Sequence, residues 1–153
     1  IQAPEDRRIH FYGKPVKQLN QLETLLHART PSHGVDSTHP PAHGAFFPEL
    51  AANFPLTLVN HPSAYRYSQP WYYGIRDNYS YTQLFRDRDQ IWFAQSPTGG
   101  GGKNPAWDFQ WFIPDYQPGE AYGFVMQAHY APWSDHATLQ KSVQKHLSAL
   151  AQD

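Results

Sequence analysis

The sequence predicts a mainly all-β protein: an antiparallel β-sandwich or jelly-roll-like barrel with one N-terminal and one C-terminal peripheral helix. Aromatic residues make up 16% of the 153 residues, and such rings pack well on the pleated surface of a sheet. The 14 prolines are about twice the ordinary usage of roughly 5%, which requires many loops and argues against a helical bundle. Segments with strand character recur roughly every 8 to 14 residues between turns, as in sandwiches and barrels.

The length of the chain suits one domain with one hydrophobic core. The chain begins at Ile1, and residues 8–12 already have the character of a strand. We therefore expect residues 1–153 to form a single sandwich domain, either alone or as the C-terminal part of a larger sandwich. In the second case another chain, or a segment that precedes this sequence, would complete the sheet.

The first predicted helix follows the strand at residues 8–12, which ends at Gly13. Pro15 stands where a helix can begin, and five apolar residues after it recur at near-helical spacing. These residues are Val16, Leu19, Leu22, Leu25 and Leu26. We expect a short amphipathic helix that extends to about Ala28.

Further strands are predicted after a long loop at residues 30–44. Their composition and alternation place them at residues 56–60, 65–75, 79–85, 90–95, 106–113 and 121–131. Pro70 is expected to interrupt the second of these, because proline cannot donate to the strand ladder. A final helix should begin at a cap supplied by Ser134 or Asp135, and an apolar stripe along it should pack on the sheet or on a partner. This stripe consists of Leu139, Val143, Leu147 and Leu150.

The charge balance excludes some classes of partner. The chain has 12 Lys and Arg, 13 Asp and Glu, and a net charge of −1, so it lacks the basic excess that nucleic-acid binding requires. No stretch approaches the 18 or so apolar residues of a membrane span. Cysteine is absent, which removes disulfides and thiolate nucleophiles. The lack of cysteine does not settle the compartment, and we favour a secreted or periplasmic location.

Residues 96–113 indicate a class of ligand. The glycine loop from Gly99 to Gly102 leads into a predicted strand that alternates Trp107, Phe109 and Trp111 with two polar residues, Asp108 and Gln110. Aromatic rings on one face and carboxylate and amide groups on the other suit a flat, hydroxyl-rich ligand such as a sugar. The loop lacks the Gly-Lys-Ser/Thr ending of a phosphate-binding loop, so nucleotide binding is not expected.

The sequence therefore predicts a carbohydrate-active protein that binds or processes a glycan in an aromatic and polar cleft, with the glycine loop at its rim. The candidate catalytic residues are His61, Asp108 and Tyr67, since His and Tyr can act as base and acid on a sugar carbon. The candidate substrate-binding residues are Arg76, Asp77, Trp107, Gln110 and His129. If the protein is an enzyme, we expect a glycan-processing lyase, hydrolase or epimerase. A glycosidase would need a second carboxylate beside Asp108, and spacing alone selects none.

Two alternatives stay open at this point. His33, His39 and His43 could hold a divalent metal in a cupin-like enzyme, although the cupin pattern of His-x-His is missing and Pro40-Pro41 disfavours a helical spacing of the last two. We expect no cofactor in the carbohydrate-binding case. The other alternative is a structural module with an aromatic core and no ligand.

Part of the chain also resembles a known group. Residues 58–132 contain the phrases VNH, PWYYG, SPTGGGGKNPAWDFQWFIPDY and YGFVMQAHY, and this stretch is similar to the C-terminal part of uncharacterised bacterial proteins with a sandwich like that of galactose mutarotase. The resemblance implies activity on sugars and a catalytic pair of one His with one Glu or Asp. His61 and Asp108 are the nearest candidates for such a pair.

Overall fold

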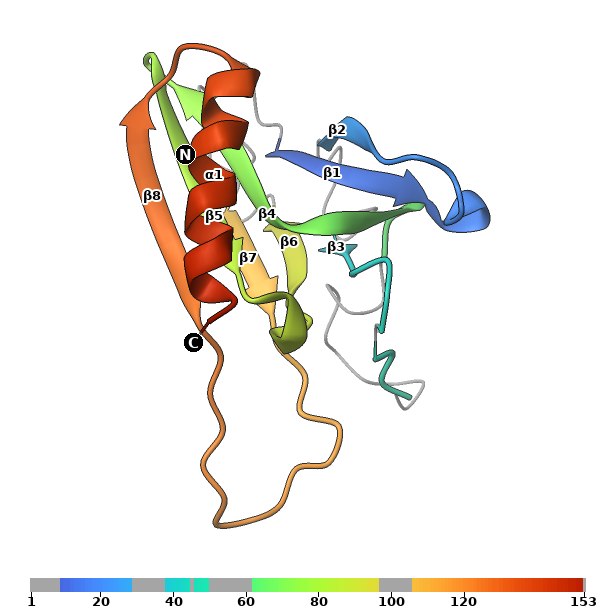
Figure 1. Cartoon of the computed structure of the whole chain (residues 1–153). Coiled ribbons are helices and arrows are strands. Elements are labelled where there is room, and N and C mark those ends of the chain that lie inside the picture. Colours follow the sequence, from blue (N-terminus) through green and yellow to red (C-terminus); the bar gives the residue numbers. More distant parts are fainter. Residues whose placement is uncertain (1–8, 29–37, 45, 50–61, 97–105, 153) are drawn as a thin grey trace.

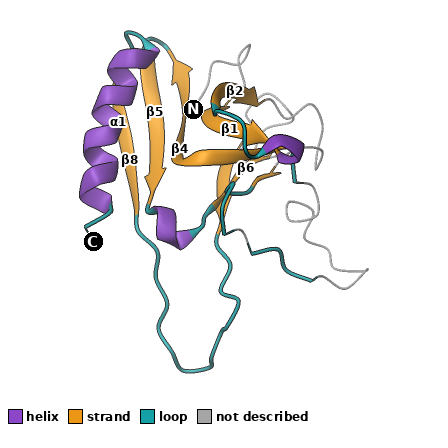
Figure 2. Cartoon of the chain, turned by 45° about the vertical axis from the view of Figure 1, so that its right-hand side comes forward, coloured by secondary structure: helices purple, strands orange, loops and turns teal. Residues whose placement is uncertain are grey.

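The structure is a computed structural model that describes residues 9–28, 38–44, 46–49, 62–96 and 106–152. It shows two antiparallel sheets and one C-terminal helix, which confirms a mainly β sandwich (Figure 1). The five-stranded sheet has the order β2 (Thr24–Ala28), β1 (Ile9–Pro15), β4 (Tyr65–Arg76), β5 (Tyr79–Phe85) and β8 (Met126–Pro132). The three-stranded sheet has the order β3 (Thr38–His39), β6 (Trp92–Ser96) and β7 (Ala106–Gln110). Helix α1 (His136–Leu150) lies over the outer face of the larger sheet, as Figure 2 also shows.

The predicted N-terminal helix is wrong. Residues 16–28 form a short 3-10 helix, η1 (Val16–Gln18), and then strand β2, which pairs with β1 so that Leu26 lies opposite Phe11. Consecutive residues of β2 face opposite sides of the sheet: Leu26 packs into the core between the sheets and Leu25 into the core under α1. Leu22, which helical spacing had placed on the apolar stripe, is 90% exposed. Pairing with β1 thus partly buries Leu25 and Leu26 on opposite sides of the sheet.

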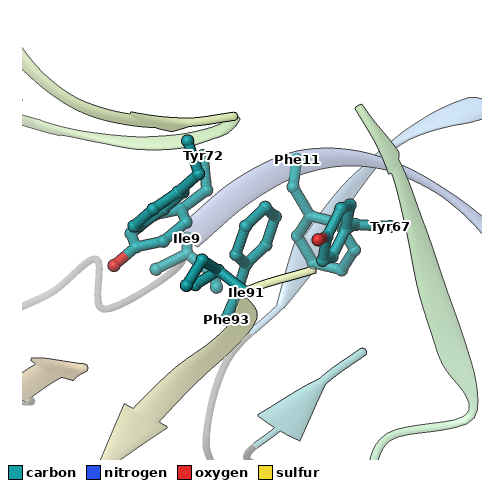
Figure 3. Close-up of a cluster of buried hydrophobic side chains, with 7 residues drawn as sticks. Ile9, Phe11, Tyr67, Tyr72, Ile91 and Phe93 are labelled. Carbon is teal, nitrogen blue, oxygen red and sulfur yellow. The ribbon is translucent and has the colours of Figure 1, made fainter. Parts of the chain in front are cut away.

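The strand pattern of β4 separates two hydrophobic cores. The side chain of Tyr72 faces the three-stranded sheet, whereas Trp71 and Tyr73 face α1. The core between the sheets contains Ile9, Phe11, Tyr67, Tyr72, Phe85, Ile91 and Phe93, most of which Figure 3 shows together. The core under α1 contains Trp71, Tyr73, Leu84, Leu139, Val143 and Leu150. Alternation along one strand therefore places large rings in both cores.

A bulge in β4 replaces the predicted interruption at Pro70. The strand is continuous from Tyr65 to Arg76, but its pairing with β1 jumps from Tyr67 opposite Gly13 to Tyr72 opposite Phe11. Between these two pairs, one residue of β1 thus faces four residues of β4, and Pro70 is one of the four. Proline has no N–H to donate, so a bulge is a place where a strand tolerates it.

A segment from the predicted loop at residues 30–44 joins the two sheets. Thr38 of β3 pairs with Ala94 of β6, and the next residues bond to β4. The Tyr67 N–H donates to the Pro40 carbonyl at 3.0 Å, and the Ala42 N–H donates to the Tyr67 carbonyl at 2.7 Å. Backbone hydrogen bonds therefore run from the small sheet to the large sheet through this segment.

The other predicted strands that the structure describes agree in position, and three of them differ in extent. The strand at residues 79–85 is β5, and that at residues 90–95 is shifted to Trp92–Ser96. The last two are shorter than predicted: β7 ends at Gln110 and β8 begins only at Met126. The strand predicted at residues 56–60 lies outside the described residues. The final helix is confirmed, and the Asp135 side chain caps it by accepting from the Thr138 N–H at 2.9 Å.

The docking of α1 can be tested by removing an apolar contact. Leu139 is 6% exposed and belongs to the core under the helix. Replacing it with alanine should lower the free energy of unfolding by about 2–5 kcal/mol, because a buried leucine loses both transfer energy and packing. Urea denaturation would measure the loss. Leu22→Ala, at a position that is 90% exposed, should change stability little; equal effects of the two variants would show that α1 is not docked through this residue.

The close approach of β1 and β4 gives a second prediction. A Cβ added at Gly13 would lie 2.6 Å from the Arg66 carbonyl oxygen, which belongs to the backbone and cannot swing away. Gly13→Ala should therefore cost about 1–3 kcal/mol of stability, the usual range for overpacking. Gly123→Ala is the matched control, since a Cβ there would meet nothing within 4 Å. Equal melting temperatures for these two variants would contradict the observed pairing.

Candidate functional site: an open tyrosine face

Three tyrosines form an open patch on the large sheet, which we call the tyrosine face: Tyr79, Tyr81 and Tyr130. Tyr79 and Tyr81 lie two residues apart on β5, and Tyr81 lies opposite Tyr130 of β8. All three side chains therefore point to the same side of the large sheet. Further along the strands, this side packs against the three-stranded sheet. Tyr79 is 41% exposed and Tyr130 is 58% exposed, and their rings stack 4.9 Å apart at an angle of 7°.

A charged pair borders the outer end of the tyrosine face. Arg76 lies opposite Tyr79 in the sheet register, and its Nε donates to the Asp77 carboxylate at 3.2 Å. Asp77 and Asn78 have φ angles of 51° and 62°, the left-handed conformation of a tight hairpin turn, which Asp and Asn tolerate well. The turn thus holds a guanidinium and a carboxylate at the edge of an aromatic surface.

A hydrogen-bonded group closes the inner end of the face. The Gln83 amide donates to the Tyr81 hydroxyl at 3.1 Å, and the Tyr72 hydroxyl donates to Gln83 Oε1 and, at 3.4 Å, to the backbone carbonyl of Asp108. Burial raises the pKa of Tyr72 far above its usual value, and the nearby Tyr81 and Asp108 raise it further. Burial also raises the pKa of the Asp108 carboxyl. A polar layer therefore separates the open tyrosines from the apolar core.

This arrangement is suited to binding rather than to covalent chemistry. Exposed rings offer apolar surface to the C–H faces of a sugar, and the flanking Arg76 and Asp77 can bond its hydroxyl groups. Arg76 and Asp77, both predicted from the sequence, thus lie at this face, whereas Asp108 belongs to β7 of the three-stranded sheet and meets Tyr72 through its backbone carbonyl.

Two other predicted residues lie elsewhere, which corrects the expected single cleft. Tyr67 is 2% exposed and stacks on Phe93 at 4.0 Å within the core between the sheets, so its side chain does not reach a ligand surface. His129 points to the opposite side of β8, where its ring packs on His146 at 5.1 Å. It borders a hollow of about 140 Å³ beside Trp133 at the start of α1.

The remaining predicted residues belong to β7 or lie outside the described residues. Gln110 follows Asp108 on the same side of β7, and its Oε1 is buried with no hydrogen-bond partner among the described residues. Phe109 and Trp111 share the other side, since both pack on Phe124 at 5.3 Å. The Trp107 side chain, His61 and the glycine loop at residues 99–102 lie outside the description.

The histidine alternative is only partly covered by the structure. His33 lies outside the described residues, His43 is exposed and His39 is 2% exposed. His39 Nδ1 bonds the Ser63 hydroxyl at 2.7 Å, and burial, with a smaller effect of Arg66, lowers its pKa to about 3. Within the described part of the chain no three His, Asp or Glu residues are grouped so that they could hold a metal ion. His39 therefore acts there as a neutral, hydrogen-bonded core residue.

Sequence reasoning missed a group of histidines and tyrosines beside α1, which we call the helix-side cluster: His10, His27, Tyr12, Tyr73 and His136. His10 and His27 are cross-strand partners whose Nδ1 atoms are 2.5 Å apart, and His10 stacks on Tyr73 at 4.7 Å. The His136 ring lies between two hydroxyls, Tyr12 at 2.7 Å from Nε2 and Tyr73 at 3.0 Å from Nδ1. These histidines and tyrosines are visible in the sequence, but only the pairing of β1 with β2 shows that His10 and His27 meet, because residues 16–28 also fit a helical pattern.

Burial disfavours the charged forms of three members of the helix-side cluster. Burial lowers the pKa of His136, and burial raises the pKa values of Tyr12 and Tyr73. A neutral imidazole has one donor and one acceptor nitrogen, so His136 accepts from one tyrosine and donates to the other. The shifts oppose transfer of a phenol proton to the imidazole, and the cluster therefore links α1 to β1 and β4 as a hydrogen-bonded network.

The fold and the face together define an antiparallel β-sandwich with an open aromatic surface. Comparison of the chain with protein-family models, with curated protein sequences and with solved structures found no match. Among the described residues, no helix has the length and apolar character needed to cross a membrane.

The buried His39 makes stability depend on pH. Its pKa in the folded state is about 3, against 6.5 for an unperturbed histidine. As pH falls, His39 is therefore protonated in the unfolded chain at a higher pH than in the folded protein. The stability that the neutral, buried His39 contributes is complete above pH 6.5 and is lost progressively towards pH 3. The slope from this one group should reach about 1.4 kcal/mol per pH unit.

The slope can be assigned to His39 with one variant. His39→Asn keeps a side-chain amide near the Nδ1 position, which can still donate to Ser63, but it does not titrate. Urea denaturation of both proteins at several pH values in this range should show a shallower loss of stability in the variant. Parallel curves would show that His39 is not buried and neutral in the folded protein.

Proposed function

We propose that the protein binds a glycan on the tyrosine face. The observation that carries the proposal is the exposed, nearly parallel pair of Tyr79 and Tyr130, with ring centroids 4.9 Å apart and Arg76 opposite Tyr79 in the sheet. Large aromatic side chains usually lie in the core, and here two of them stand open side by side. Rigid rings bind a ligand at low cost in conformational entropy.

The charges around the face favour a neutral glycan. Arg76 is already paired with Asp77, whose side chain is 81% exposed, and a further carboxyl, Asp108, lies near the inner end of the face. The guanidinium and the Asp77 carboxylate can each bond hydroxyl groups, whereas the carboxylates disfavour the acid groups of a uronate. We therefore expect neutral oligosaccharides to bind more tightly than uronate-containing ones of the same length.

The proposed function is binding, which the described residues support more directly than catalysis. Of the residues that the sequence suggested for catalysis, Tyr67 belongs to the core, and Asp108 lies on a different sheet from the open tyrosines. The surface offers stacking and hydrogen bonding, which a binding protein needs and which a lyase, hydrolase or epimerase would also need for holding its substrate.

Titration calorimetry with soluble oligosaccharides tests the proposal. Neutral and uronate-containing oligosaccharides are tested in separate panels, and we expect the wild-type protein to bind a neutral oligosaccharide. Tyr130→Ala should weaken its binding by about tenfold or more, because truncating an aromatic anchor costs about 2 kcal/mol or more and 1.4 kcal/mol corresponds to a factor of ten. Arg76→Gln should weaken it less, since a glutamine amide can still bond hydroxyl groups.

Tyr116→Ala is the matched control, since Tyr116 is 60% exposed, close to the 58% of Tyr130, but lies on a different part of the surface. It should leave the affinity unchanged. If the wild-type protein binds no oligosaccharide of either panel, the face does not serve glycans, and the structural module with an aromatic core becomes the better account. Equal affinities of wild type and Tyr130→Ala would place any binding elsewhere.

A further inference from the structure

A projecting arm forms the second unusual surface of the molecule. The chain between β7 and β8, residues 111–125, leaves the body and returns without forming a helix or strand (Figures 1 and 2). Every residue from 114 to 123 is exposed. Loops of more than about 12–15 residues without secondary structure are uncommon in compact domains and usually have a function.

The two ends of the arm are anchored by aromatic contacts. Trp111 packs on Phe124 across the two ends at 5.3 Å, and Phe112 packs on the buried Trp92 at 4.9 Å. The Val125 N–H donates to the Asp89 carboxylate at 2.9 Å. The arm therefore leaves the sandwich in a fixed direction.

The tip of the arm is braced by one tyrosine. The Tyr122 hydroxyl accepts from the Gln117 N–H at 2.7 Å, and the Tyr122 ring lies 5.7 Å from that of Tyr116. A turn within the tip is closed by the Glu120 N–H, which donates to the Gln117 carbonyl at 3.2 Å. These bonds hold Tyr116 outward, 60% exposed, and a preorganised loop loses less conformational entropy when it binds a partner.

The chemistry of the arm is aromatic and acidic. Residues 111–125 include Asp115 and Glu120 but no lysine, arginine or histidine. An exposed tyrosine with acidic neighbours suits a partner surface that has an apolar hollow bordered by cations. Tyrosine is also among the residues that most often dominate protein–protein binding energies.

The same chain carries a surface of this kind at η1. A hollow of about 390 Å³ is lined by Pro15, Val16, Lys17, Gln18, Ala64 and Tyr65. Its apolar walls include Val16, 38% exposed, and Tyr65, 41% exposed. The hollow is lined by η1 and by the residues around it, and it shares no residue with the arm, so the two are separate surfaces.

Cations gather around this hollow without acidic partners among the described residues. Lys14 and Arg66 lie directly opposite each other in the β1–β4 register, and Lys17 lines the hollow. The ion pairs between described residues involve Arg76 and Arg86 instead. Like charges opposite each other on neighbouring strands are unfavourable, and an acidic group docked beside them would relieve the repulsion.

We propose that the arm of one molecule docks into the hollow of a second copy, with Tyr116 on the apolar wall and the arm carboxylates beside Lys14, Lys17 and Arg66. Because arm and hollow are different surfaces, the contact is heterologous: each copy donates one arm and accepts another. Such contacts close into a ring or extend into an open chain. The tyrosine face is not part of this contact, so self-association is independent of glycan binding.

Sedimentation velocity over a range from low micromolar to several hundred micromolar tests the proposal. The weight-average mass of the wild-type protein should rise with concentration. Tyr116→Ala and Lys17→Glu should each abolish the rise, while Tyr130→Ala, which removes an equally exposed tyrosine from the other surface, should keep it. Unchanged melting temperatures would show that the variants are folded.

A charge exchange makes the test specific to the two surfaces. The double variant Asp115→Lys with Glu120→Lys carries a basic arm and a basic hollow, and Lys17→Glu carries an acidic arm and a less basic hollow. Each should be monomeric alone, and their equimolar mixture should associate. A wild-type protein that stays monomeric at every concentration, arm and hollow variants that still associate, or a mixture that remains monomeric would each overturn the proposal.

Discussion

The rest of the structure depends on the alternation of three large rings along one central strand. Trp71, Tyr72 and Tyr73 follow one another in β4 and are almost completely buried, yet they belong to two different cores. Tyr72 holds the two sheets together, while its neighbours on either side hold α1 against the larger sheet. A shift of β4 by one residue would exchange the faces and bury neither set correctly. The alternation of these three residues therefore fixes which side of β4 faces each core.

A core made of such residues brings polar atoms with it, and several of these atoms find partners inside. The Tyr72 hydroxyl bonds Gln83 and the Asp108 carbonyl, and the buried His39 bonds Ser63. An unpaired polar group at these depths would cost about 1–3 kcal/mol. The hydrogen-bonded group at Tyr72 and Gln83 also determines where the dry interior ends, and so where the sheet becomes an open surface. The candidate site is thus a consequence of how the core is terminated.

The sequence predicted a helix or strand correctly where apolar residues recur regularly on one face of it. Strand β5 and helix α1 were predictable because their apolar residues follow a period of two or of nearly four residues, and Asp135 supplies a recognisable cap. The segment from Val16 to Ala28 was not, because its apolar residues recur at near-helical spacing and only the pairing with β1 shows that residues 24–28 form a strand. The bulge at Pro70 depends in the same way on the pairing of two strands.

The candidate site likewise contains residues that the sequence could place and residues that it could not. Arg76 and Asp77 could be placed near aromatic residues from the sequence, since a turn that joins two aromatic strands must bring them there. Tyr67 could not be separated from Tyr79 and Tyr130, because a tyrosine has the same composition signal in a core and on a surface. What separates them is the extent of the smaller sheet: Phe93 of β6 covers Tyr67, whereas Tyr79 and Tyr130 keep 41% and 58% of their surface exposed. The number and length of the covering strands follow from tertiary structure and are not encoded near the tyrosines themselves.

Exposed tyrosines also differ among themselves in how they are held, and this difference separates the two surfaces that they form. Tyr79 and Tyr130 stand on paired strands, so their spacing is set by the sheet, which gives a flat surface suited to a flat ligand. Tyr116 stands on an arm whose shape is set by the hydroxyl of Tyr122 and by rings at its base. A projecting ring of this kind cannot offer a flat surface, but it can enter a concave one. In the two proposals made above, the geometry of the support, rather than the residue type, is therefore the reason for a flat ligand on the sheet and for a concave partner surface at the arm.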